Sequence, residues 1–214
     1  MSSELFKRIV SSLILLPLVI FIIIYNNIIF TLFLIICLII SLYEWISMKK
    51  NKIINFVGLF FLFFTFFLAY QLRYELVENY TYFLITILIC VCTDMGGYTF
   101  GKLFKGPKLT KISPNKTYSG MIGGFLLPII ILQILFNLKS LNFEINLSIN
   151  SVLFIFFISF FSQIGDICIS YFKRKSNIKD TGKLIPGHGG LLDRIDGIIF
   201  AIPASYFIIS YSLI

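Results

Sequence analysis

Apolar residues run along the chain in long blocks separated by short polar segments. Seven blocks approach or reach the roughly 20 residues that an α-helix needs to cross a bilayer: 9–25, 28–47, 54–72, 81–100, 119–137, 149–172 and 195–213. These blocks lack the polar face that a water-soluble helix presents. The pattern therefore predicts an all-α fold, a polytopic integral membrane helix bundle with about seven transmembrane helices.

The composition excludes a soluble helical protein. Of the 214 residues, 58% are hydrophobic and 13% are charged, and the mean hydropathy is +0.94. A soluble domain carries about 25% charged residues, so this chain could not cover a water-facing surface. The first block is too long for the apolar core of a signal peptide, and no A-x-A site follows it. We therefore expect it to be a retained span.

Positive charge falls on one side of the predicted bundle. If the seven spans alternate, 16 of the 18 Lys and Arg residues lie on one side, and only Arg73 and Lys139 lie on the other. Such a bias is typical of cytoplasmic loops, so we predict an N-in, C-out topology. Basic residues placed at anionic headgroups explain the positive net charge without a nucleic-acid partner.

The chain divides into two regions of different character. Residues 1–80 hold three N-terminal transmembrane helices with little chemistry, and their one acid within a span is Glu44. An acid there is by default a functional candidate, although a local salt bridge with the adjacent lysines is an equal alternative. Residues 81–214 carry polar groups at the cytoplasmic ends of their spans. We expect the functional site in this second transmembrane region.

One stretch of the sixth block, SQIGDICISYFKR at 162–174, combines an acid with two cations. A face within roughly a 100° arc of this helix carries Gln163, Asp166, Ser170, Lys173 and Arg174. An acid inside a span must face the bundle interior and be paired. Asp166 therefore either serves a site or forms a salt bridge with Lys173 that only locks the helix.

A loop and two further acids follow. GKLIPGHGG at 182–190 cannot be helical because Pro186 and four glycines break it, and its backbone N–H groups can cradle an anion. Asp193 and Asp196 follow at i and i+3 on one helical face. Carboxylates suit Mg²⁺, which takes one or two of them and leaves its other positions to phosphates. His188, the only histidine, cannot make a zinc site alone.

Cations surround these acids and suit the same phosphates: Lys173, Arg174, Lys179, Lys183 and Arg194. Carboxylates, a glycine loop and cations together predict a nucleotide-phosphate or lipid-phosphate site. A polar stretch at 92–124 adds Asp94 and five lysines. Its G-x-x-x-x-G-K run is no P-loop, because Leu103 stands where Ser or Thr is needed. Gly120-x-x-x-Gly124 predicts close helix packing.

The run from Ser170 to Asp196 resembles the full signature of bacterial phosphatidate cytidylyltransferases, the CDP-diacylglycerol synthases. It reads S-x-F-K-R-x4-K-D-x-G-x2-I-P-x-H-G-G-L-x-D-R-I-D and covers 27 positions without a break. The stretches QIGD, D-x-G-G-Y, SPNKT and G-x-I-G-G also resemble the family, so the likeness spans about residues 90–200. The family pattern often has Glu where this chain has Ser119.

This resemblance implies transfer of CMP from CTP to phosphatidic acid in the bacterial inner (plasma) membrane, with a multi-pass protein whose active site faces the cytoplasm. It implies Mg²⁺ or another divalent cation, held by Asp166 and Asp193, and leaves room for a second, monovalent cation and for a homodimer. We assign catalysis to Asp166, Asp193, Lys173 and Arg194. We assign substrate binding to Ser170, Arg174, Lys179, His188, Gly189, Gly190, Asp196, Asp94 and Lys116.

Two other functions compete with this reading. A transporter or channel for anionic solutes would spread polar residues through the bilayer midplane, whereas the charge here stays at one face. A CTP-dependent polyprenol kinase would use the same nucleotide and a lipid acceptor, but it would transfer the γ-phosphoryl group. The unbroken signature favours the cytidylyltransferase.

Overall fold

The computed structural model describes residues 17–25, 27–48, 51–74, 80–110, 113, 116–137, 149–182, 184 and 189–211. Five of its helices are long and apolar enough to cross a membrane: α2 (Asn27–Ser47), α3 (Lys52–Tyr74), α4 (Thr81–Phe104), α5 (Tyr118–Asn137) and α6 (Ile149–Lys175). Residues 17–25 are also helical. An isolated antiparallel bridge joins Lys108 and Thr117. The predicted polytopic helix bundle is confirmed, while the count of seven spans stays a prediction.

The last predicted span differs from expectation. Instead of one helix from residue 195, the chain forms the short helix α7 (Leu192–Ile195), a turn, and then α8 (Ile198–Ser210). At 1.5 Å per residue, the 13 residues of α8 are shorter than a full span. Within this turn the Asp196 carboxylate accepts the Gly197 N–H at 2.9 Å. Gly197 also lies directly against Ser162 of α6, where a Cβ would overlap the hydroxyl.

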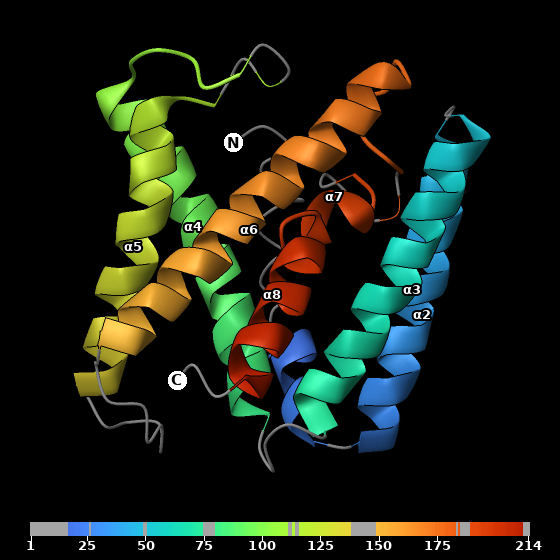
Figure 1. Ribbon diagram of the computed structural model, residues 1–214, viewed down its shortest axis with the longest axis horizontal. Helices are drawn as coiled ribbons and strands as arrows, with labels where there is room; N and C mark the ends of the chain where they lie inside the picture. Colours follow the sequence, from blue (N-terminus) through green and yellow to red (C-terminus); the bar gives the residue numbers. More distant parts are fainter. Residues whose placement is uncertain are drawn as a thin grey trace.

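Helix α8 lies at the centre of the bundle, where it contacts α3, α4 and α6 (Figure 1). Its residues Ala201 and Ser205 have no exposed surface. Neighbouring helices satisfy the polar groups that this burial encloses. Thr65 of α3 donates to the Ile199 carbonyl at 3.0 Å, and the hydroxyls of Thr86 and Ser205 lie 2.7 Å apart. These two hydrogen bonds between neutral groups join α8 to α3 and α4.

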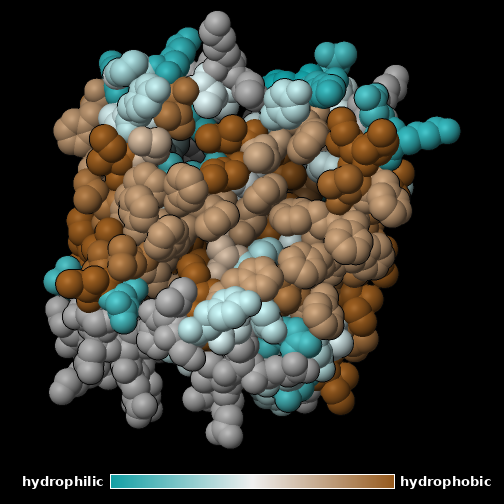
Figure 2. All heavy atoms as spheres, viewed as in Figure 1, coloured by the Kyte–Doolittle hydropathy of each residue, from teal (hydrophilic) through white to brown (hydrophobic). Residues whose placement is uncertain are grey.

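The outer surface is apolar along the helices and polar at their ends. Figure 2 shows a broad hydrophobic belt, with hydrophilic residues gathered at the two edges. The described residues of the 105–117 connection, the C-terminal end of α6 and the adjoining ends of α2 and α3 lie at the same end of the bundle, which we call the polar end (Figure 1). This arrangement agrees with the predicted grouping of the basic segments, and the orientation in a membrane stays a prediction.

Helices α4 and α5 pack with almost no side chain between them. A Cβ on Gly120 would lie 2.6 Å from the Gly97 carbonyl oxygen, and one on Gly124 would lie 3.2 Å from the Thr93 carbonyl oxygen. Such distances leave no room for a methyl group, so small residues let the two backbones approach. The predicted packing role of Gly120-x-x-x-Gly124 is confirmed.

We expect Gly96→Ala to destabilise this helix pair, since its Cβ would overlap the Gly123 carbonyl. Overpacking of this kind costs about 1–3 kcal/mol. Gly97→Ala is the matched control, because the nearest atom to its Cβ is 3.8 Å away. Thermal unfolding of both variants in detergent measures the difference, and equal midpoints would show that α4 and α5 can separate freely.

Candidate active site

Helix α6 brings the predicted face to the polar end. Ser170 donates to the Asp166 carboxylate at 3.3 Å, and Lys173, three residues further on, is only 9% exposed. Asp166 forms its salt bridge with Lys116, which comes from the α4–α5 loop. The alternative that Asp166 merely locks its own helix by pairing with Lys173 is therefore wrong. A contact between α6 and the α4–α5 loop decides the partner.

Lys173 pairs instead with Asp193 of α7. The Lys173 Nζ and Asp193 Oδ1 atoms are 2.8 Å apart, and the side chains are 11% and 5% exposed. The other oxygen, Oδ2, accepts the backbone N–H groups of Thr181 at 2.8 Å and Gly190 at 3.0 Å. Thr181 Oγ1 also lies 3.1 Å from it. Both oxygens of Asp193 are thus fully engaged.

These contacts keep Asp193 ionised. Burial alone would raise its pKa, but the hydrogen bonds from Lys173, Gly190 and Thr181, together with the Lys173 charge, hold the pKa below its usual range. Gly189 has φ 87°, in the left-handed region, and a Cβ there would lie 2.9 Å from Asp193 Oδ2. Only glycine suits both the backbone angle and this close approach.

The backbone N–H groups beside the described part of the glycine loop hold the protein's own carboxylates, while binding of a substrate anion by residues 182–190 stays a prediction. Besides Asp193, the loop holds Glu44 of α2, which is 3% exposed. Glu44 accepts the N–H groups of Leu191 and Leu192 at 2.9 and 2.8 Å and the Thr181 hydroxyl at 2.7 Å. Among the described residues its partners are hydrogen-bond donors of this loop. The alternative of a local salt bridge with Lys49 or Lys50 falls on residues outside the described part.

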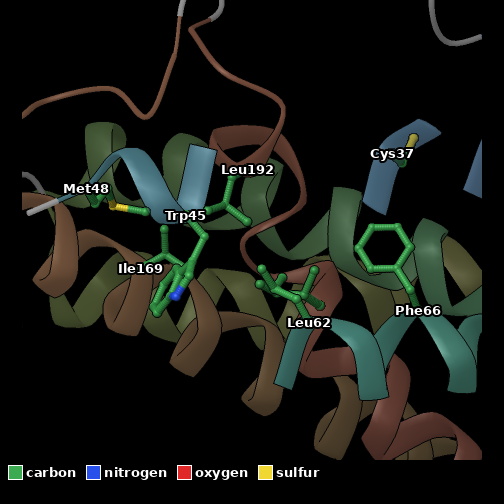
Figure 3. Packing of buried hydrophobic residues seen from close by; sticks show 8 residues of the cluster. Cys37, Trp45, Met48, Leu62, Phe66, Ile169 and Leu192 are labelled. Atoms are coloured by element: carbon green, nitrogen blue, oxygen red, sulfur yellow. The ribbon is translucent and has the colours of Figure 1, made fainter. Parts of the chain in front are cut away.

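A hydrophobic cluster holds the end of the loop that leads into α7. It brings together Trp45, Met48, Leu62, Ile169 and Leu192 (Figure 3). Leu192, whose N–H donates to Glu44, has no exposed surface. Trp45 packs edge-on against Phe172, with ring centroids 5.2 Å apart. The first turn of α7 is thereby held between α2, α3 and α6.

Two further acids, Asp94 and Asp196, interact electrostatically with the charged groups of this site. The charge of Asp94 acts on Asp166, Lys116 and Arg194, and the charge of Asp196 acts on Asp94, Asp166 and Lys173. Asp193 and Asp196, the predicted i, i+3 pair, have different partners. Asp193 forms an ion pair with Lys173, while Asp196 accepts the Gly197 N–H. Four carboxylates and at least three cations therefore share one electrostatic neighbourhood.

The remaining predicted residues are at the rim or outside the described part. Arg174, Lys179 and Arg194 are exposed, and Arg174 also donates to the Ile178 carbonyl at 3.3 Å. His188 and Lys183 fall outside the described residues. Ser119, where the family pattern often has Glu, donates to the Lys105 carbonyl and so ties the α4–α5 loop to its helix.

The carboxylates differ in how well they suit a divalent cation. The described residues contain no group of three or more His, Cys, Asp or Glu arranged to hold a metal ion. Mg²⁺ needs only one or two carboxylates when phosphates complete its shell. Both carboxylates have partners on their two oxygens, but the Asp166 side chain is 31% exposed and could serve, whereas Asp193 is 5% exposed. The geometry favours Asp166 over Asp193 as a ligand.

Two residues of this site were not assigned a role from the sequence. Thr181 lies between the loop's Asp180 and Gly182, and its hydroxyl touches both Glu44 and Asp193. Its position inside the signature was the only available signal. Glu44 was noticed as an acid within a span, but a partner 137 residues away has no signal in one sequence.

An apolar bundle with buried, paired charges at one end defines the class: a multi-pass membrane protein with a phosphate-directed site. The chain belongs to the Cytidylyltransferase family, whose sequence model matches residues 6–80 and 52–212. It is 36% identical over 215 residues to the phosphatidate cytidylyltransferase of Rickettsia bellii, covering 96% of this chain and 91% of that protein. The Rickettsia felis phosphatidate cytidylyltransferase is 34% identical over 213 residues, covering 96% and 92%.

A third relative is longer than this chain. The phosphatidate cytidylyltransferase of Staphylococcus aureus (strain COL) is 38% identical over 151 residues, covering 70% of this chain and 54% of that protein. The match therefore spans about half the length of the staphylococcal protein and nearly all of the rickettsial ones.

Asp193→Asn is expected to abolish turnover and to lower stability. The variant leaves Lys173 buried without its counter-charge, and breaking a buried pair costs about 3–5 kcal/mol. Adding Lys173→Gln removes the unpaired charge and should restore much of the unfolding midpoint. We expect the double variant to stay inactive, measured as product formed per folded protein.

Stability and activity separate the two roles of the pair. If the double variant regained both its unfolding midpoint and near-normal turnover, the pair would be a structural device only. Asp166→Asn, whose partner Lys116 is partly exposed, should lose turnover with a smaller loss of stability.

Proposed function

We propose that this protein transfers CMP from CTP to phosphatidic acid, forming CDP-diacylglycerol and releasing pyrophosphate. A phosphate oxygen of the lipid forms a bond to the α-phosphorus of CTP, and the bond from that phosphorus to the leaving pyrophosphate breaks. The observation that carries the proposal is the pairing of Asp166 with Lys116 and of Asp193 with Lys173 at one end of an apolar bundle, in segments that resemble the family. The names of the rickettsial relatives support the same reaction.

The location of these groups suits two substrates of opposite character. Phosphatidic acid reaches the bundle laterally through the bilayer, and CTP arrives from water. Their phosphates can meet only where the apolar belt gives way to charged groups. Lys116 and Lys173 come from different segments and both lie at that level, so each can face one of the two phosphate groups.

Catalysis here needs charge neutralisation more than proton transfer. The attacking lipid phosphate is already an anion, so no strong general base is required. Lysine ammonium groups placed where negative charge develops stabilise the transition state without reorganisation. The exposed cations Arg174, Lys179 and Arg194 are suited to hold the departing pyrophosphate.

We propose that a divalent cation enters with the nucleotide. Mg²⁺ is commonly held by one or two carboxylates together with substrate phosphates, and the partly exposed Asp166 is the carboxylate that best suits it. When bound, the ion would neutralise phosphate charge. Asp193 would become a second ligand of this ion only if its ion pair with Lys173 were broken.

The cytoplasmic face of the bacterial inner membrane is the proposed position of the polar end. The one-sided distribution of Lys and Arg supports this orientation. A reporter fused after Lys175 should be active in the cytoplasm, and one fused after Ile214 should be active outside it. A cytoplasmic C-terminus would change the span count by one. The homodimer stays a prediction that mass measurement in detergent can test.

Position-specific labelling of CTP tests the reaction itself. With purified protein and phosphatidic acid, label in the α-phosphate should enter the lipid, while label in the γ-phosphate should leave as pyrophosphate. A polyprenol kinase would move the γ-label to its lipid. A transporter would move neither label, and that outcome would exclude both enzymes.

The same assay tests the divalent cation. Excess chelator should stop turnover, and Mg²⁺ should restore it. The unfolding midpoint should stay unchanged, because packing rather than the ion holds the helices together. Full turnover in chelator would refute the proposed metal.

A further inference from the structure

Glu44 lies in α2, in the part of the chain that carries none of the predicted site residues. Its carboxylate is nevertheless enclosed by the loop that precedes α7. Oε1 accepts the Leu191 N–H at 2.9 Å, and Oε2 accepts the Leu192 N–H at 2.8 Å. The Thr181 hydroxyl lies 2.7 Å from Oε2. An acid from the front of the chain thus organises the signature loop.

The loop backbone closes tightly on this carboxylate. A Cβ on Gly182 would lie 2.7 Å from Glu44 Oε1, and one on Gly190 would lie 2.6 Å from either carboxylate oxygen. Glycine at both positions lets the backbone reach the carboxylate. The next residue of α2, Trp45, packs against Phe172 of α6, so the helix that supplies Glu44 is itself fixed to the helix that supplies Lys173.

Only two contacts separate Glu44 from the ion pair. Thr181 touches both carboxylates, at 2.7 Å from Glu44 and 3.1 Å from Asp193. A hydroxyl has one proton to donate, so it bonds to one carboxylate at a time, and Glu44 is the nearer. When the Thr181 hydroxyl donates to Glu44, the charge of Asp193 is balanced by Lys173, whose Nζ lies 2.8 Å away.

We propose that Glu44 is a positioning residue for the transfer reaction: through Thr181 and the loop N–H groups it sets the orientation of Asp193 and Lys173. The inference rests on the proposed function. Glu44 does not touch the substrates; it acts on the groups that do. Loss of Glu44 should therefore lower kcat and leave both KM values nearly unchanged.

Glu44→Gln is the first test. Its amide has one acceptor oxygen where the carboxylate has two, so its NH₂ would face either the Leu191 N–H or both the Leu192 N–H and the Thr181 hydroxyl. In either orientation at least one loop donor would lose its acceptor. We expect kcat to fall by about tenfold or more, as for other residues that orient a reactive group. Ser41→Ala is the matched control. Ser41 is equally buried in α2, and among the described residues it bonds within its own helix, to the Cys37 carbonyl. It should keep wild-type kcat.

A double-variant cycle separates positioning from general loss of structure. Thr181→Val removes the shared hydroxyl, and Thr181→Ser keeps it and should rescue kcat. If Glu44 acts through Thr181, adding Glu44→Gln to Thr181→Val should lower kcat much less than adding it to the wild type. Fully multiplicative losses would overturn the proposed route.

Hydrogen–deuterium exchange gives a readout that does not need turnover. Peptides covering residues 189–195 should exchange faster in Glu44→Gln than in wild type or Ser41→Ala. Unchanged exchange or unchanged kcat in Glu44→Gln would overturn the proposal. If wild-type protein fails to move the α-label of CTP to phosphatidic acid, the proposed function fails. Faster exchange would then still assign Glu44 to the loop.

Discussion

Lys173 and Asp193 carry opposite charges into a place that water hardly reaches, and the segment between α6 and α7 is folded around them. Moving two charges out of water is costly, and their attraction compensates only when the remaining oxygens and protons also find partners. Thr181 and Gly190 supply those partners for Asp193. The N–H groups of Thr181 and Gly190 can bond to Asp193 because the backbone at these two residues is not helical.

A second carboxylate shares the loop and changes what the loop can bind. The N–H groups of Thr181 and Gly190 are taken by Asp193, and those of Leu191 and Leu192 are taken by Glu44. These backbone donors are not available to a substrate phosphate. Among the described residues, the long and adjustable side chains of Arg174, Lys179 and Arg194 are exposed and suit phosphates. A site that accepts a lipid from one direction and a nucleotide from another benefits from such adjustable groups.

The sequence was sufficient for the long helices and for the identity of the charged residues. Continuous apolar runs predicted α2 to α6 to within a few residues, and helical spacing placed Asp166 beside Ser170. The division of the last span into α7 and α8 has no signal in the spacing of apolar residues, and it lies where Gly197 packs against Ser162. The pairing of Lys116 with Asp166 could not be predicted either. Spacing on one helix suggests partners on that helix, whereas tertiary contacts here join separate segments.

The glycine contact between α4 and α5 has a consequence for conformational entropy at the site. It holds the two ends of the 105–117 connection close together, and the connection is further closed by the Leu109 N–H to Lys116 carbonyl bond at 2.8 Å. A free loop of such length loses entropy when a ligand orders it. Here the backbone that presents Lys116 is restricted before any ligand arrives. Contact with an anion therefore has to immobilise little more than one side chain.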